Sequence, residues 1–171
     1  MNTRIVVLLM VSFGTLLFAE NPQSKKEDTM TIKVHDSEPR GRAHAKSKIT
    51  VQSSEAKPYD QTASPTLMEI HINETFTGDI DGESTVRALQ VQRDEKSASL
   101  VSMQRFRGKL GGRQGTFVLQ GSETVENGKI KATWFVVPGS GTGDLSGLRG
   151  EGGFEGNFGK GSDGRLDYWF E

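Results

Sequence analysis

The chain has 171 residues, a formal net charge of −1 and no cysteine. The lack of thiols excludes disulfide bonds, thiol catalysis, thiolate metal sites and a lipid anchor on cysteine. A nearly neutral charge gives no electrostatic reason to expect nucleic acid or an anionic membrane surface as a partner, so we expect neither.

The first nineteen residues show the three-part pattern of a secretory signal peptide. Arg4 supplies the positive charge, residues 5–18 are almost wholly apolar, and the small Ala19 stands at a suitable cleavage site. The apolar run is shorter than the roughly 20 residues that a membrane span needs. We therefore expect a signal peptide over residues 1–19, a periplasmic or secreted protein, and no stable membrane anchor after cleavage. An uncleaved N-terminal anchor is the alternative.

Residues 20–46 are polar and charged, and only Met30, Ile32 and Val34 interrupt this composition. Such a segment buries too little apolar surface to offset the entropy that it would lose on ordering. We expect a disordered spacer over residues 20–46 and one folded domain over residues 47–171. A short edge strand at residues 30–34 is the less favoured alternative.

Beyond residue 47 apolar and polar residues alternate, which is typical of half-buried β-strands. The alternation is clearest in Met68, Ile70, Ile72 and Phe76. Asn127-Gly128 predicts a tight hairpin, because both residues tolerate a positive φ. The pattern predicts eight strands, near residues 49–53, 68–76, 85–91, 97–107, 116–123, 129–137, 150–158 and 165–171.

Eight closely spaced strands and no amphipathic helix favour an all-β fold, a closed antiparallel β-barrel of about eight strands. Seventeen of the 21 glycines lie from Gly108 onward, in turns and within the late strands. Glycine inside a strand marks bulges and sharp bends, which closed barrels need. The spacing leaves a sandwich of two sheets as the alternative.

Five stretches resemble, in the same order, those of one bacterial family, the domain of unknown function DUF3224. The longest is WFVVPGSGTGDLSGLRGEGGF at residues 134–154, and the others lie at residues 57–60, 76–85, 105–120 and 166–171. The resemblance covers residues 47–171. It implies a small closed barrel similar to that of plant allene oxide cyclase, and so favours the barrel over the sandwich. It implies no particular reaction.

The chain departs from the family pattern at two positions of chemical interest. Gln104 stands where the family usually has glutamate, and Gly121 stands where it commonly has histidine. If those two residues formed an acid–base pair in the family, this chain would lack both. The departures therefore weaken the expectation of proton-transfer chemistry.

The alternation also selects an acidic residue for the barrel interior. Glu74 has the same parity as Ile70, Ile72 and Phe76, and desolvation in the interior would raise its pKa. Because carboxylates are seldom buried without a partner, we favour a solvated Glu74, at the barrel mouth or beside a bulge near Thr77-Gly78.

Four further side chains complete the candidate set. Gln104 and Phe106 share one face of their strand, and Trp134 and Tyr168 are aromatic candidates for the interior. An inward glutamine either orients a ligand or satisfies a neighbouring backbone group, and the two roles are equally supported. Aromatic side chains more often form core than pocket. The predicted ligand-binding residues of the interior are Glu74, Gln104, Phe106, Trp134 and Tyr168.

No other type of site is indicated. The three histidines are widely spaced, so we expect no metal site and no cofactor. We expect an exported barrel that binds a small apolar or amphipathic molecule. The alternative is a cyclase- or isomerase-like enzyme related to allene oxide cyclase, using Glu74 and Gln104. A homo-oligomer formed through the outer wall is a third expectation.

Overall fold

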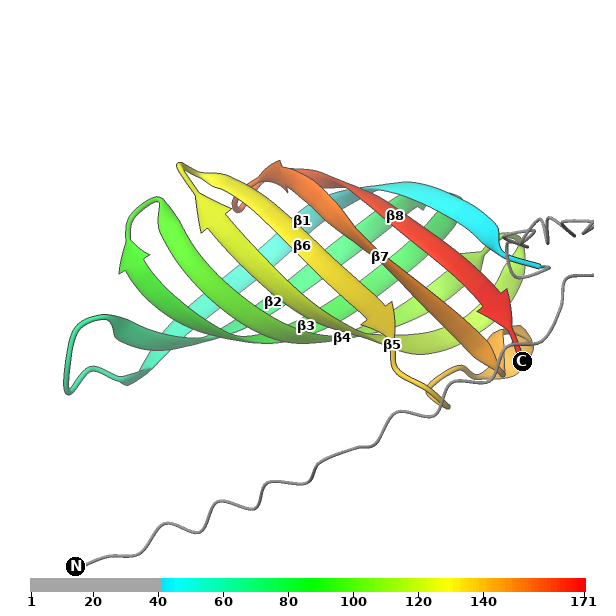
Figure 1. Ribbon diagram of the computed structural model, residues 1–171, viewed down its shortest axis with the longest axis horizontal. Helices are drawn as coiled ribbons and strands as arrows, with labels where there is room; N and C mark the ends of the chain where they lie inside the picture. The colour runs from blue at the N-terminus through cyan, green and yellow to red at the C-terminus, as the bar shows by residue number, and fades with distance from the viewer. Residues whose placement is uncertain (1–40) are drawn as a thin grey trace, which may run out of the picture. The chain divides into compact units, whose positions relative to one another are not determined.

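In a computed structural model the chain forms a closed barrel of eight antiparallel strands (Figure 1). The structure describes residues 41–171, so the expected signal peptide and most of the expected spacer lie outside the described residues. Each strand pairs with the next, and the last pairs with the first. The strands are β1 (Ala43–Asp60), β2 (Thr66–Gly78), β3 (Ile80–Asp94), β4 (Ser97–Leu110), β5 (Arg113–Glu126), β6 (Lys129–Val136), β7 (Leu148–Asn157) and β8 (Gly161–Phe170).

The local sequence accounts for this topology. Buried and exposed residues alternate along most of β3 to β6 and along the first half of β1, as a wall with an apolar inside requires. Asn127 and Gly128 both adopt positive φ, 51° and 73°, in the turn between β5 and β6. The predicted all-β barrel is confirmed, and the sandwich alternative is wrong because β8 pairs with β1 over eight residue pairs.

The barrel begins earlier than the sequence predicted. Strand β1 starts at Ala43, within the expected spacer of residues 20–46. Ala45 is only 2% exposed and pairs with Leu166 of β8. The polar His44 and Lys46 obscure this strand in the sequence, because their exposed side chains alternate with the buried Ala45 and Ser47.

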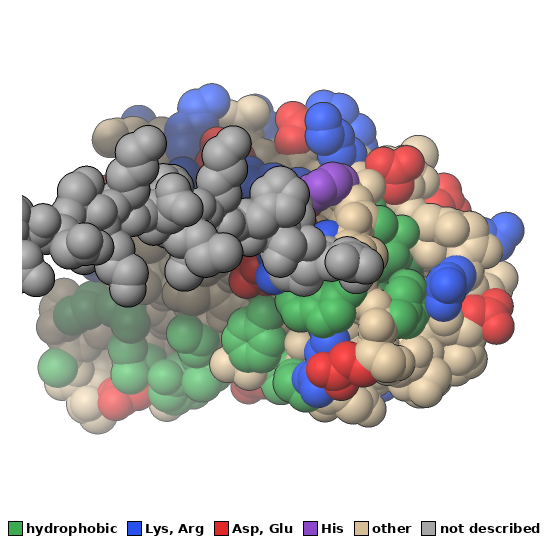
Figure 2. All heavy atoms as spheres, turned by 45° about the vertical axis from the view of Figure 1, so that its right-hand side comes forward, with side chains coloured by type: hydrophobic (Ala, Val, Ile, Leu, Met, Phe, Trp, Pro, Cys, Tyr) green, Lys and Arg blue, Asp and Glu red, His purple; other side chains and the backbone are tan. Residues whose placement is uncertain are grey.

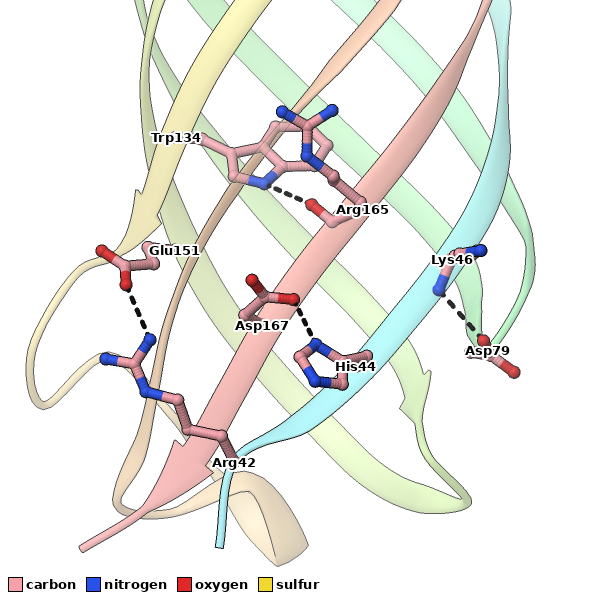
Figure 3. Close-up of polar contacts among 8 residues, drawn as sticks. All are labelled: Arg42, His44, Lys46, Asp79, Trp134, Glu151, Arg165 and Asp167. Carbon is pink, nitrogen blue, oxygen red and sulfur yellow. Dashed lines mark hydrogen bonds and ion pairs between the residues drawn. The ribbon is translucent and has the colours of Figure 1, made fainter. Parts of the chain in front are cut away.

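Polar contacts between side chains on the outer surface accompany the closure of the barrel (Figure 3). His44 Nδ1 lies 2.6 Å from Asp167 Oδ1 across the β1–β8 seam, and Arg42 Nη1 lies 2.9 Å from Glu151 Oε1. Exposed pairs of this kind contribute about 0–1 kcal/mol each. The backbone ladder between β1 and β8 therefore provides most of the closure.

One end of the barrel, here called the capped end, is filled by side chains. It carries the β2–β3 and β4–β5 turns and the loop of residues 137–147, which includes the short 3-10 turn Gly143–Leu145. Phe106 and Phe117 are fully buried there, with ring centroids 4.8 Å apart. The indole of Trp134 donates a hydrogen bond to the Arg165 carbonyl, 3.1 Å away (Figure 3). This end holds the larger hydrophobic core.

The opposite end, here called the cavity end, carries the β1–β2, β3–β4, β5–β6 and β7–β8 turns. Its buried apolar cluster is smaller and contains no aromatic side chain. The buried members are Ile70, Ala88, Ala98, Leu100 and Val125. Because alanine fills so little volume, side chains do not occupy this end completely.

The outer wall has mixed character. Basic and acidic side chains are interspersed on the face that Figure 2 shows. Leu89, Val101, Met103 and Phe135 are exposed on the outside of β3, β4 and β6. Within residues 41–171 we find no helix with the length and apolar character needed to cross a membrane. Homo-oligomerisation through this wall stays a prediction.

Candidate functional site

A cavity of about 280 Å³ occupies the cavity end of the barrel. The turn between β7 and β8, including Phe158 and Lys160, contributes to its lining. At the roughly 30 Å³ that one water occupies in the liquid, this space suits a molecule of on the order of ten non-hydrogen atoms. Its inner lining is mainly apolar and also contains a group of polar side chains. The apolar residues are Met68, Ile70, Ile72, Val86, Ala88, Leu100, Ile130 and Phe154, and the polar residues are Glu74, Gln90, Ser102, Gln104 and Glu123.

Glu74 points into this cavity. Strands β1 and β2 stay in register at Thr77 and Gly78, so the bulge considered near these residues is not there. Burial raises the pKa of Glu74 to about 7, with a further contribution from the negative charge of Glu123; hydrogen bonds from Ser84 and Gln104 act in the opposite direction. Glu74 is half-buried on the inner face, so it faces inward rather than lying fully in solvent beside a bulge. Glu74 faces inward as its strand parity predicted, because no bulge interrupts β2 between Ile70 and Phe76.

Gln104 is the side chain that makes the burial of Glu74 tolerable. It is 5% exposed, and its Nε2 donates to Glu74 Oε2 at 2.8 Å and to Ser84 Oγ at 2.7 Å. The amide of Gln104 thus binds neighbouring side chains, whereas the sequence suggested a backbone group or a ligand as its partner. A hydrogen bond of this kind from Gln104 stabilises the charged form of the carboxyl group, which burial alone would disfavour.

A second carboxyl group, Glu123 on β5, was missed by the sequence analysis. It is 6% exposed, and Ser102 Oγ donates to its Oε1. Burial raises the pKa of Glu123 to about 7, and the Ser102 hydrogen bond only partly opposes this. The signal was present, because Glu123 has the same parity as the buried Phe117 and Leu119.

Gly121 provides the space in which Ser102 reaches Glu123. It is buried on the inner face of β5. A β-carbon at Gly121 would collide with Glu123 Oε1 and with Ser102 Oγ. The absence of a side chain at Gly121 therefore leaves the gap that accommodates the hydrogen bond.

The three aromatic candidates lie elsewhere in the barrel. Phe106 and Trp134 belong to the core of the capped end, and Tyr168 packs against that core. None of the three lines the cavity. The structure thus brings Glu74 and Gln104 together and separates them from Phe106, Trp134 and Tyr168. Strand parity says whether a side chain faces inward, but it does not say at which level of the barrel the side chain lies.

The cavity combines two carboxyl groups with little positive charge. Among the described residues that line it, Lys160 in the β7–β8 turn is the single basic side chain. Burial raises the pKa of both Glu74 and Glu123 to about 7, and in the structure both carboxyl groups accept hydrogen bonds from neighbouring side chains. Residues 41–171 contain no group of three or more histidine and acidic side chains arranged to hold a metal ion.

Comparison with known proteins identifies the family. Residues 45–171 match the family model described as "Protein of unknown function (DUF3224)". A solved structure of a DUF3224 protein with unknown function from Shewanella oneidensis MR-1 is similar, with 27% identity and a TM-score of 0.60 over 76% of this chain and 98% of that chain. No curated protein matches the chain. The chain belongs to the DUF3224 family.

Proposed function

We propose that this protein binds a small, predominantly apolar molecule inside the cavity end of its barrel. The observation that supports this most directly is the cavity itself, which has apolar walls and a few convergent polar groups. Ligand sites in proteins commonly combine these two features, and barrel mouths are among their preferred positions. At about 280 Å³ the cavity lies near the lower limit of known sites, which favours a small ligand.

The energetics of the cavity also favour a binding role. Burying carboxyl groups in an apolar space destabilises a fold, and apolar side chains of similar volume are often neutral or better for stability. The capped end of the same barrel shows that these strands can be packed with aromatic residues. Sites that sacrifice stability in this way are commonly functional.

Filling the cavity tests this proposal. Ala88 is 3% exposed and lines the cavity from β3, so Ala88→Leu places a larger side chain in the space. We expect wild type to bind probes such as octan-1-ol or 2-phenylethanol, with a thermal shift and a calorimetric Kd. We expect Ala88→Leu to weaken this binding by at least about tenfold, since the larger side chain takes up part of the cavity volume that the ligand needs.

The neighbouring residue on β3 offers a matched control. Leu89 is 50% exposed and points away from the interior, so Leu89→Ala should leave the Kd unchanged. Binding that Ala88→Leu does not alter, or no binding of any apolar probe of this size by wild type, would contradict the proposal.

The second candidate function is an isomerase that moves a proton. The pair of buried carboxyl groups favours it, because two such groups near pKa 7 are suited to act as base and acid. The ionised carboxylate would take a proton from the carbon beside a carbonyl group. The protonated carboxyl would give its proton to the carbonyl oxygen, and the resulting enol would be reprotonated at carbon.

Deuterium exchange separates this second function from simple binding. If the protein enolises a bound ketone, the α-protons of cyclohexanone should exchange with D₂O faster in its presence, and Glu74→Gln or Glu123→Gln should abolish that acceleration. An exchange rate equal to that of buffer would exclude enolisation of this probe and leave the binding function intact.

A further inference from the structure

We propose that the cavity takes a small apolar amine, whose ammonium group is held by Glu74 and Glu123. This inference rests on the proposed function and adds the chemical class of the ligand. It is carried by the hydrogen-bonding groups of the cavity, by their charges, and by the volume available.

The polar groups of the cavity have more acceptors than donors. Glu123 Oε2 and Gln90 Oε1 are both buried, and no hydrogen-bond donor of the described residues reaches either atom. The side chain of Gln90 is 3% exposed, and its Nε2 already donates to Gln92 Oε1. The amide of Gln92 donates in turn to the Asp94 carbonyl, which fixes the orientation of both amides. The missing partners are therefore donors.

The donors beside the two carboxyl groups are already engaged. Gln104 Nε2 donates to Glu74 and Ser84, and the Ser102 hydroxyl donates to Glu123. An ammonium group carries three donors and no acceptor. It would match the acceptors that the wall leaves, namely Glu74, Glu123 Oε2 and Gln90 Oε1.

The charges lead to the same ligand class. The titratable side chains lining the cavity are Glu74 from β2, Glu123 from β5, and Lys160 in the β7–β8 turn. The hydrogen-bond partners of these two carboxyl groups are the uncharged Ser102, Ser84 and Gln104, and burial raises the pKa of both carboxyl groups. A bound cation would compensate their negative charge and expel protons from the pair, whereas an anionic ligand would be repelled.

The apolar side chains of the cavity determine the character of the rest of the ligand. Ile70, Ile72, Val86, Leu100 and Phe154 surround the space and offer no hydrogen bond. With room for on the order of ten non-hydrogen atoms, the ligand would have one nitrogen and a compact hydrocarbon body. A polyamine would leave additional charges desolvated against apolar walls, at a high energetic cost.

Three probes of nearly equal size and different charge test the inference. Calorimetry at pH 8 would compare 2-phenylethylamine, 2-phenylethanol and phenylacetate with the full chain. We expect the amine to bind at least about tenfold more tightly than the alcohol, with the anion weakest, because the carboxyl groups are then ionised. At pH 5 both carboxyl groups are mainly protonated, and the advantage of the amine should shrink.

Conservative variants provide the second measurement. Glu123→Gln and Glu74→Gln should each weaken the affinity for the amine by at least about tenfold and change the affinity for the alcohol by less than about threefold. The glutamine side chain keeps the shape of glutamate and removes its charge. Near neutral pH, the binding heat of the amine in wild type should depend on the ionisation enthalpy of the buffer, which reports released protons. Correct folding of each variant is checked by circular dichroism.

The outcomes distinguish this inference from the proposed function. If the alcohol binds as tightly as the amine, or if phenylacetate binds most tightly, the amine proposal is wrong and the proposed apolar binding site stands. Amine binding that both variants retain at full strength also overturns it. If neither these probes nor octan-1-ol bind wild type, the proposed function and this inference fail together.

Discussion

The two ends of the barrel interior are built from the same strands but are filled differently. At the capped end, β4 and β5 contribute Phe106 and Phe117, both fully buried. Toward the cavity end, the same two strands contribute Ser102 and Glu123, which line the cavity. One continuous pair of strands therefore changes from aromatic packing to polar lining within a few residues.

This difference teaches how one small fold separates stability from a site. Aromatic side chains bury large areas and gain further from contacts between rings, so the capped end supplies much of the folding free energy. Phe106 contacts two other rings, with centroid distances of 5.5 Å to Phe76 and 4.8 Å to Phe117. The cavity end can then retain space and buried carboxyl groups that would be costly in a less stable molecule.

The largest expected effect breaks the capped end. Phe106→Ala should lower the free energy of unfolding by about 3–5 kcal/mol, because it removes a fully buried ring and leaves a cavity among close neighbours. Leu100→Ala at the cavity end should cost only about 2 kcal/mol, since one side of Leu100 already faces the cavity. Urea unfolding monitored by circular dichroism measures both, and equal costs would contradict the division of roles.

A smaller effect concerns pH and the cavity end. The folded pKa of Glu123, about 7, is above its ordinary value of 4.5, so the folded state holds the extra proton more tightly. The stability that this provides is complete below pH 4.5 and is lost as the pH rises through 7. As the pH rises from 5 to 8, the free energy of unfolding of Glu123→Gln should therefore increase by about 2–3 kcal/mol relative to that of wild type.

Urea unfolding at the two pH values measures this gain. Glu83→Gln is the control, because Glu83 is exposed on the outside of β3 and its substitution should have an effect within about 0.5 kcal/mol. A Glu123→Gln variant whose stability difference from wild type is the same at pH 5 and pH 8 would show that Glu123 is solvated in the folded protein.

Much of the fold was predictable from local sequence. Alternation found the eight strands, and Asn127-Gly128 located the turn between β5 and β6 because few residue pairs accept positive φ so easily. The start of β1 was not predictable in this way. Its outward residues are polar and its inward Ala45 is small, so only the pairing with β8 reveals the strand.

The site was predictable in part, and the reason for the limit is physical. Parity correctly directed Glu74 and Gln104 inward, and the same argument applied to β5 would have found Glu123. Parity carries no information about depth along the barrel, which depends on strand tilt and register. Phe106 and Gln104 are only two residues apart, yet Phe106 lies in the filled core and Gln104 on the cavity.

The smallest expected effect tests how the cavity wall is assembled. In Gly121→Ala the new β-carbon would displace Ser102 and Glu123, which can move because the colliding atoms are side-chain ends. Losing their hydrogen bond costs about 1 kcal/mol, but alanine recovers about 0.4–1 kcal/mol from the reduced entropy of the unfolded chain. The free energy of unfolding at pH 5 should therefore change by less than about 1 kcal/mol.

The clearer signal from Gly121→Ala is the titration of Glu123. The Ser102 hydrogen bond lowers the pKa of Glu123, so its loss should raise that pKa further above 7. Ser102→Ala is the matched variant, because it removes the same hydrogen bond without adding a β-carbon at residue 121. NMR titration of ¹³C-labelled glutamate carboxyl groups should show the Glu123 midpoint shifted upward in both variants. An unchanged midpoint in both would mean that Ser102 does not donate to Glu123 in solution, and the count of free acceptors in the cavity would have to be revised.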